Sequence, residues 1–178
     1  NYLLKMVSEI IVIKGIRVKI SWFPRGKKIP PRVTQVSGYC FNKKGEVLIV
    51  KNKNGHWNFP GGHPEKKETP VETLKREIWE EAKVEIKEEC LIGYQKIECL
   101  QKPYLKEGKT HHQLRYICLV KKISKFTADF ETRERKFVKQ DHLDKFIPWV
   151  KGKTAQAQVN LLNNFYKQNF TLKKHHSL

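Results

Sequence analysis

Apolar residues alternate with polar or basic residues over several short stretches, and this period of two predicts β-strands. The stretches with this pattern lie at 8–23, 33–42, 46–51, 91–99, 113–121 and 135–138. The first of them breaks near Gly15 and predicts an N-terminal β-hairpin. Because an exposed strand edge can pair with another chain, this hairpin suggests a homodimer contact.

Two segments have helical spacing instead. In the segment from Thr69 to Ala82, the apolar residues recur every four positions at Leu74, Ile78 and Ala82. Thr69 can cap this helix, with Glu72 three positions after the cap. The segment at 154–168 has an apolar stripe typical of an amphipathic C-terminal helix. A helix in the middle of the strands and another at the end predict an α+β fold.

The formal net charge of the 178-residue chain is +18, which favours polyanionic partners such as nucleotides or nucleic acid. The alternative is that the lysines form an ordinary solvated surface. The apolar stretch at 10–13 is too short for a signal peptide or a membrane span. The four cysteines lack metal-site spacing, and free thiols are typical of a reducing compartment. We therefore expect a cytoplasmic protein with no membrane partner.

A cluster of carboxylates lies on the first predicted helix. Glu77, Glu80 and Glu81 share one face at spacings of three and four residues, where like charges repel. A hard cation would reverse that penalty, and carboxylate oxygens are preferred ligands of Mg²⁺ and Mn²⁺. The alternative is an ordinary acidic helix face. The metal interpretation gains support from the Gly-Gly turn before the helix and from the basic character of the rest of the chain.

The stretch Gly62–Val84 resembles the Nudix box in residue identity and in spacing. The matching positions are Gly62, Glu68, Arg76, Glu77, Ile78, Glu80, Glu81 and Val84. The lead-in WNFPGG at 57–62 is also similar to that of the family. Lys83 departs from the pattern, because the family has a glycine there that often ends the helix in a left-handed turn.

The resemblance implies a Nudix-like α/β/α sandwich with a mixed β-sheet. The expected organisation is an N-terminal hairpin extension at 1–32 packed on the core, a hydrolase domain at 33–170 and a flexible tail at 171–178. In the family, glutamates of the box bind Mg²⁺, for which Mn²⁺ is a substitute. Carried over, the metal ligands are Glu77, Glu80, Glu81 and the backbone carbonyl of Gly61.

The resemblance also assigns roles beyond the metal. Glu77 and Glu80 are candidate catalytic residues, whereas Glu68 and Arg76 form a structural pair. Family members often carry a further base in a later loop, and here the segment ETRERKFV offers Glu134 and Glu131. The alternative for Glu134 is a surface salt bridge with the basic residues around it.

The expected activity is metal-activated hydrolysis of the pyrophosphate linkage in a nucleoside diphosphate derivative, for example a nucleoside triphosphate. One alternative is a Nudix-fold nucleotide- or RNA-binding module without turnover, and another is a basic nucleic-acid-binding protein. Weaker candidates for substrate contacts are loop histidines, stacking aromatics and phosphate-binding arginines. They are His111, His112, Tyr39, Trp57, Phe59, Arg32 and Arg115.

Overall fold

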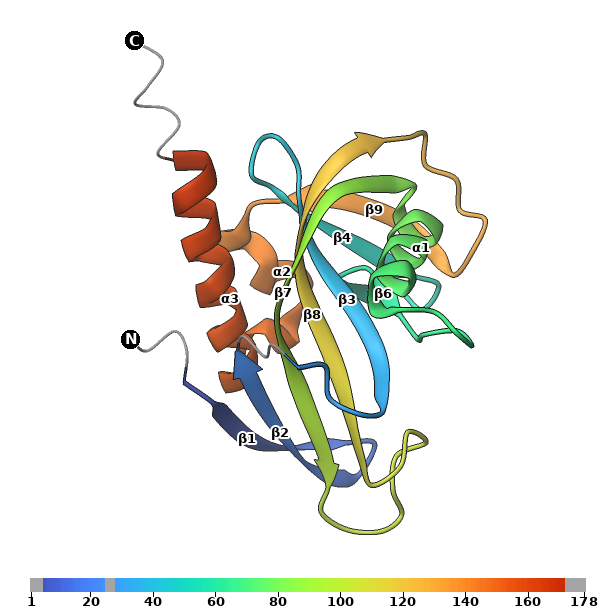
Figure 1. Ribbon diagram of the computed structural model, residues 1–178, viewed down its shortest axis with the longest axis vertical. Coiled ribbons are helices and arrows are strands. Elements are labelled where there is room, and N and C mark those ends of the chain that lie inside the picture. The colour runs from blue at the N-terminus through green and yellow to red at the C-terminus, as the bar shows by residue number, and fades with distance from the viewer. Residues whose placement is uncertain (1–4, 25–27, 172–178) are drawn as a thin grey trace.

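The computed structural model describes residues 5–24 and 28–171 (Figure 1). The strands in these ranges are β1 (Val7–Ile13), β2 (Ile16–Pro24), β3 (Val33–Phe41), β4 (Val47–Asn52), β5 (Trp57–Asn58), β6 (Gly61–Gly62), β7 (Val84–Cys99), β8 (Thr110–Ile123) and β9 (Thr132–Val138). The helices are α1 (Pro70–Ala82), α2 (Leu143–Phe146) and α3 (Lys153–Tyr166), with single turns η2 (Gln140–His142) and η3 (Pro148–Lys151) and a terminal π-turn η4 (Lys167–Thr171).

The strands form one mixed sheet in the order β1-β2-β7-β8-β3-β4-β5, with β6 added to β3 and β9 to β4. Strands β3 and β8 run parallel, and the other pairings in the described ranges are antiparallel. Helix α1 covers one face of the sheet and α3 lies on the other (Figure 1). This arrangement confirms the predicted α+β sandwich.

Helix α1 forms as its sequence predicts. Thr69 and Glu72 make a reciprocal capping box, with Thr69 N donating to Glu72 Oε2 over 2.7 Å. Leu74, Ile78 and Ala82 are fully buried against the sheet. Burying these side chains contributes roughly 1.5–3 kcal/mol for each of the larger two, which fixes the rotation of the helix. The glutamates lie on the neighbouring, half-buried face of the helix.

The N-terminal hairpin is joined to both the sheet and the C-terminal helix. Strand β2 pairs with the second half of β7, from Val18 opposite Cys99 to Pro24 opposite Gly93. From β1, the Glu9 carboxylate accepts hydrogen bonds from the backbone N–H groups of Thr154 (2.7 Å) and Lys153 (3.1 Å). A carboxylate at a helix N-terminus satisfies free N–H groups and complements the helix dipole. The hairpin therefore extends the sheet and caps α3.

Several predicted boundaries were wrong. Strand β7 starts at Val84, directly after α1, and β8 starts at Thr110. His111 and His112 were expected in a loop, but they lie in β8 because pairing with β7 continues through both residues. Glu134 lies within strand β9, paired opposite Lys51 of β4, and not in a loop.

Other expectations stay predictions. The homodimer contact at the β1 edge is untested. Of the tail expected at 171–178, residue 171 ends η4 and residues 172–178 lie outside the described residues. Among residues 5–24 and 28–171, none of the helices has the length and hydrophobicity needed to cross a membrane.

Lys83 ends α1 in a left-handed conformation, with φ 53° and ψ 42°. In this conformation a residue with a Cβ raises the free energy of the folded state by roughly 1 kcal/mol relative to glycine. We predict that the Lys83→Gly variant is more stable than Lys83→Ala by about 1 kcal/mol, because both lose the same side-chain contacts. Urea denaturation of the two variants measures this difference. Equal stabilities would show that this backbone conformation carries no cost.

Candidate active site

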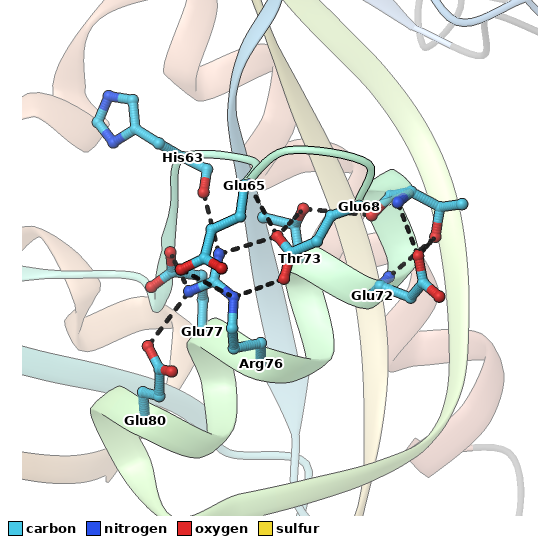
Figure 2. Close-up of polar contacts among 9 residues, drawn as sticks. His63, Glu65, Glu68, Glu72, Thr73, Arg76, Glu77 and Glu80 are labelled. Carbon is cyan, nitrogen blue, oxygen red and sulfur yellow. Dashed lines mark hydrogen bonds and ion pairs between the residues drawn. The ribbon is translucent and has the colours of Figure 1, made fainter.

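Arg76 lies at the centre of the carboxylate cluster on α1 (Figure 2). Its Nε and Nη2 donate to both oxygens of Glu68, over 2.7 and 3.0 Å. Its Nη1 donates to Glu77 over 3.0 Å and to Glu80 over 3.2 Å. Nη2 also donates to the carbonyl of His63 over 3.0 Å. One guanidinium thus ties the loop after β6 to the helix.

The protonation behaviour of this cluster follows from its contacts. Hydrogen bonds from Arg76 hold the pKa of Glu68 down, at about 2. The same hydrogen bonds, with the negative charge of Glu77 nearby, raise the pKa of Arg76 above its ordinary value. A bidentate arginine–carboxylate pair is among the stronger polar contacts in proteins. This geometry agrees with the predicted structural role of Glu68 and Arg76.

Strand β6 brings the glycine turn against both the sheet and the glutamates. The N–H of Gly61 donates to Glu81 Oε2 over 2.9 Å. A Cβ at Gly62 would lie 2.2 Å from Glu77 Oε1, and one at Gly61 would lie 2.3 Å from the carbonyl oxygen of Val36. Such approaches are closer than van der Waals contact allows. Only glycine therefore fits at either position without displacing a carboxylate or the backbone.

Two of the three cluster glutamates hold protons more tightly than usual. Burial raises the pKa of Glu81 to about 7, against the opposing hydrogen bond from Gly61 and with help from the charges of Glu77 and Glu131. Burial also raises the pKa of Glu77, although Arg76 opposes that shift. Desolvated and crowded carboxylates favour either a proton or a cation. A positive charge bound beside Glu77 and Glu81 would therefore stabilise their ionised carboxylates.

The residues present fit a divalent cation, although their carboxylates face other partners. In the described ranges, no three His, Cys, Asp or Glu side chains are gathered closely enough to hold a metal. Glu77 and Glu80 face Arg76, and Glu81 faces the Gly61 N–H. The carboxylates of Glu77 and Glu80 can turn from Arg76 toward a cation. Arg76 would stay in place, because its two hydrogen bonds to Glu68 remain. Oxygen donors of this kind suit Mg²⁺ and Mn²⁺.

The candidate bases outside the helix differ in surroundings. Glu134 is half-exposed and forms ion pairs with Lys51 (3.5 Å) and Lys136 (3.7 Å). Glu131 precedes β9, and its carbonyl accepts from the N–H of Lys53 over 3.0 Å. The charge of Glu131 is among the causes that raise the pKa of Glu81. The expected salt bridges of Glu134 are thus present, and Glu131 lies within electrostatic reach of the cluster.

Lys83 anchors the segment that leads to Glu131. Its side chain is buried, with Nζ 3.5 Å from Asp129 Oδ2 and 4.5 Å from the centre of the Phe130 ring. Arg135 adds hydrogen bonds to the carbonyls of Ala82 and Ser124, at the C-terminus of α1 and the start of this segment. Sequence reasoning missed these contacts, since the lysine stood out only as a departure from a motif.

Three of the seven weaker candidates lie on the α3 face of the sheet. Tyr39 is buried, and its hydroxyl donates to Gln158 over 2.7 Å. Phe59 packs edge-on against Tyr39 and Trp149. Arg115 is buried beside a cavity of about 480 Å³ that Phe59 and Trp149 also line. Phe59 and Arg115 therefore line one cavity, and Tyr39 packs against Phe59 without lining it.

The remaining candidates lie elsewhere. Trp57 is half-buried and packs edge-on against Phe146. Arg32 donates to the carbonyl of Glu107, and the ring Nδ1 of His112 lies 2.6 Å from the carbonyl oxygen of Pro31. His111 is almost fully buried, and its Nδ1 has no hydrogen-bond partner among the described residues. None of these four side chains lines the cavity beside Arg115.

Comparison with known proteins identifies the family of the domain. The family model described as the NUDIX domain matches residues 31–158. A MutT-like protein of Streptomyces ambofaciens is 33% identical over 75 residues, which are 41% of this chain and 49% of that protein. The match to this curated relative thus spans about half of its length.

Solved structures of low sequence identity share the fold. A pyrophosphohydrolase of Bacillus subtilis, BsRppH, has a TM-score of 0.67 and 18% identity, over 83% of this chain and 91% of that one. The NUDIX domain of Shewanella oneidensis NrtR, solved with ADP ribose, has a TM-score of 0.57 and 14% identity, over 75% and 90%. An Ap4A hydrolase of C. elegans has a TM-score of 0.53 and 13% identity, over 75% and 98%.

The Glu68–Arg76 pair predicts an acid dependence of stability. Because the pKa of Glu68 falls from 4.5 to about 2 on folding, the pair stabilises the fold above the unfolded value and loses that contribution as the pH falls toward 2. The Glu68→Gln variant should therefore be clearly less stable than the wild type near pH ~7, with the difference shrinking toward pH ~3. Urea denaturation across this range measures the trend.

Glu65→Gln is the matched control, because Glu65 lies 4.0 Å from Arg76 Nε and is mostly exposed. It should change stability little at any pH in this range. If the stability difference between Glu68→Gln and the wild type stays constant with pH, the assigned ion pair is wrong.

Proposed function

This chain belongs to the NUDIX family, and on that basis we propose that it hydrolyses the pyrophosphate linkage of a nucleoside diphosphate derivative with the help of a divalent cation. The observation that carries the proposal is the set of three glutamates on α1 beside the glycine turn of β6. A pyrophosphohydrolase and an ADP-ribose complex among the structures of similar fold support the chemical class.

Glu77, Glu80, Glu81 and the backbone carbonyl of Gly61 are the proposed ligands of Mg²⁺, with Mn²⁺ as a substitute. When bound, such an ion supplies charge neutralisation for the phosphoryl oxygens. Burial strengthens the case, because Glu81 and Glu77 are costly to keep charged without a cation. The N–H of Gly61 donates to Glu81, so these two proposed ligands already lie side by side.

The reaction needs a water oxygen to bond to phosphorus while the bridging P–O bond breaks. The water proton goes to a base, and the bridging oxygen leaves with the second phosphate. Glu77 and Glu80 lie on the same helix face and are the proposed catalytic groups within the box. Glu134 is the proposed base outside it, with Glu131 as the alternative. Arg76 holds the helix and the loop together during these changes.

The Glu81→Gln variant should lose on the order of a hundredfold in kcat, because the amide cannot supply the negative charge that a cation requires. The measurement is phosphate or nucleotide release from a panel of nucleotides with Mg²⁺. Glu88→Gln is the matched control, since Glu88 is exposed on β7 and pairs with Lys87. Full Mg²⁺-dependent activity in Glu81→Gln would refute the ligand assignment.

The two candidate bases can be separated by the same assay. We expect Glu134→Gln to lower kcat more than Glu131→Gln, because Glu134 is the proposed base and the largely exposed Glu131 carboxylate lies beside Lys53. A base should contribute on the order of a hundredfold. If Glu131→Gln has the larger loss, the base is Glu131, whose charge acts on Glu81, and not Glu134.

A further inference from the structure

Strand β1 forms a free edge of the sheet. It stands at one end of the strand order and pairs only with β2, from Val7 opposite Trp22 to Ile13 opposite Ile16. Among residues 5–24 and 28–171, no other backbone forms hydrogen bonds with β1. The N–H and C=O groups on its outer side are therefore available to a strand from another molecule.

This edge lacks the features that usually prevent one sheet from pairing with another. Such features are lysine side chains, proline, β-bulges and very short strands. The residues of β1, VSEIIVI, include no lysine, arginine or proline, and their register with β2 has no shift. Strand β5, at the other end of the strand order, has only two residues. Of these two edges, β1 is thus the one suited to pairing.

Apolar side chains are exposed along the same edge. Ile10 and Val12 are 56% and 66% exposed, and Met6, just before the strand, is 53% exposed. Glu9 and Ile11 line the cavity on the α3 face, so the alternation along a strand turns Ile10 and Val12 to the other face. Exposed apolar residues that gather on one surface are typical of interaction sites.

The charge of this edge favours a second copy of the chain. With 36 basic residues and a net charge of +18, two copies repel unless they meet where positive charge is absent. Strand β1 meets that condition, and its one charged residue, Glu9, accepts hydrogen bonds from the N-terminus of α3. A polyanion such as nucleic acid would need lysine or arginine along the edge, and β1 has neither.

The sequence of β1 is also compatible with pairing to itself. A twofold axis at Ile10, the middle residue of the strand, would set two copies antiparallel with Ile10 opposite its own copy. Ser8 would then lie opposite Val12, and Glu9 opposite Ile11. No two like charges face each other in this register, and like charges directly opposite would be destabilising. The surface is therefore self-complementary, as a twofold interface requires.

We propose that two copies of this chain associate through antiparallel pairing of their β1 strands about Ile10, which makes one sheet continuous across the dimer. This inference goes beyond the proposed function and does not depend on hydrolysis. Strands β2, β7 and β8 separate β1 from β3, which carries the glycine turn of β6, and Figure 1 shows β1 far from α1. The proposed active site is thus outside the interface. A single pair of strands makes a small interface, so the expected Kd is on the order of micromolar.

Sedimentation equilibrium of the full chain, from about 1 to 100 µM, tests the pairing. We expect the wild type to shift from monomer to dimer over this range. Ile10→Lys puts like charges opposite each other at the axis and should remain monomeric. Ile123→Lys is the matched control, because Ile123 is 47% exposed at the end of β8, and it should dimerise like the wild type. A monomeric wild type at the highest concentration would overturn the proposal, and so would a dimeric Ile10→Lys.

A second variant tests the register. Ile10→Glu should also be monomeric alone, but an equal mixture with Ile10→Lys should form a dimer, because opposite charges then meet across the axis. Both variants should keep the wild-type circular dichroism spectrum, since Ile10 is exposed, and this separates lost pairing from unfolding. A mixture that stays monomeric would show that Ile10 does not face its copy, and would overturn the proposed pairing.

Discussion

The hydrogen bonds of Arg76 hold the proposed active site together. One edge of the guanidinium binds both oxygens of Glu68 and fastens the loop after β6 to α1. The other edge reaches Glu77 and Glu80, whose like charges would otherwise repel on the helix. These two groups of contacts involve different nitrogen atoms. The loop can therefore stay fastened while the carboxylates exchange one positive partner for another, as the proposed chemistry requires.

Local signals explain why α1 and its site were predictable. The capping box of Thr69 and Glu72 and the four-residue spacing of the buried face act within one helix. The spacing of Glu77, Glu80 and Glu81 likewise fixes a shared face without knowledge of the rest of the fold. The same holds for the resemblance to the family, since the motif is continuous in sequence. The order of the strands, by contrast, was not predicted, because periodicity identifies strands without showing which of them pair.

The features that sequence missed depend on contacts between distant segments. Gln35, Gln95 and Gln113 come from three strands, and only their register brings them to the guanidinium of Arg115. Each glutamine alone is an ordinary polar residue of a strand. In the sequence, Lys83 is only a departure from the motif. In the structure, its side chain contacts Asp129 and Phe130 in the segment before β9. A polar residue at an otherwise apolar strand face is the signal that would have found the cavity.

The central claim is that carboxylates of α1 hold a divalent cation, and direct Mn²⁺ binding tests it without any assumption about substrate. Electron paramagnetic resonance measures free Mn²⁺ as the ion is titrated into the chain. The wild type and Glu88→Gln should remove Mn²⁺ from solution alike, whereas Glu81→Gln should bind it much more weakly. Equal Mn²⁺ binding by the wild type and Glu81→Gln would show that Glu81 is not a metal ligand.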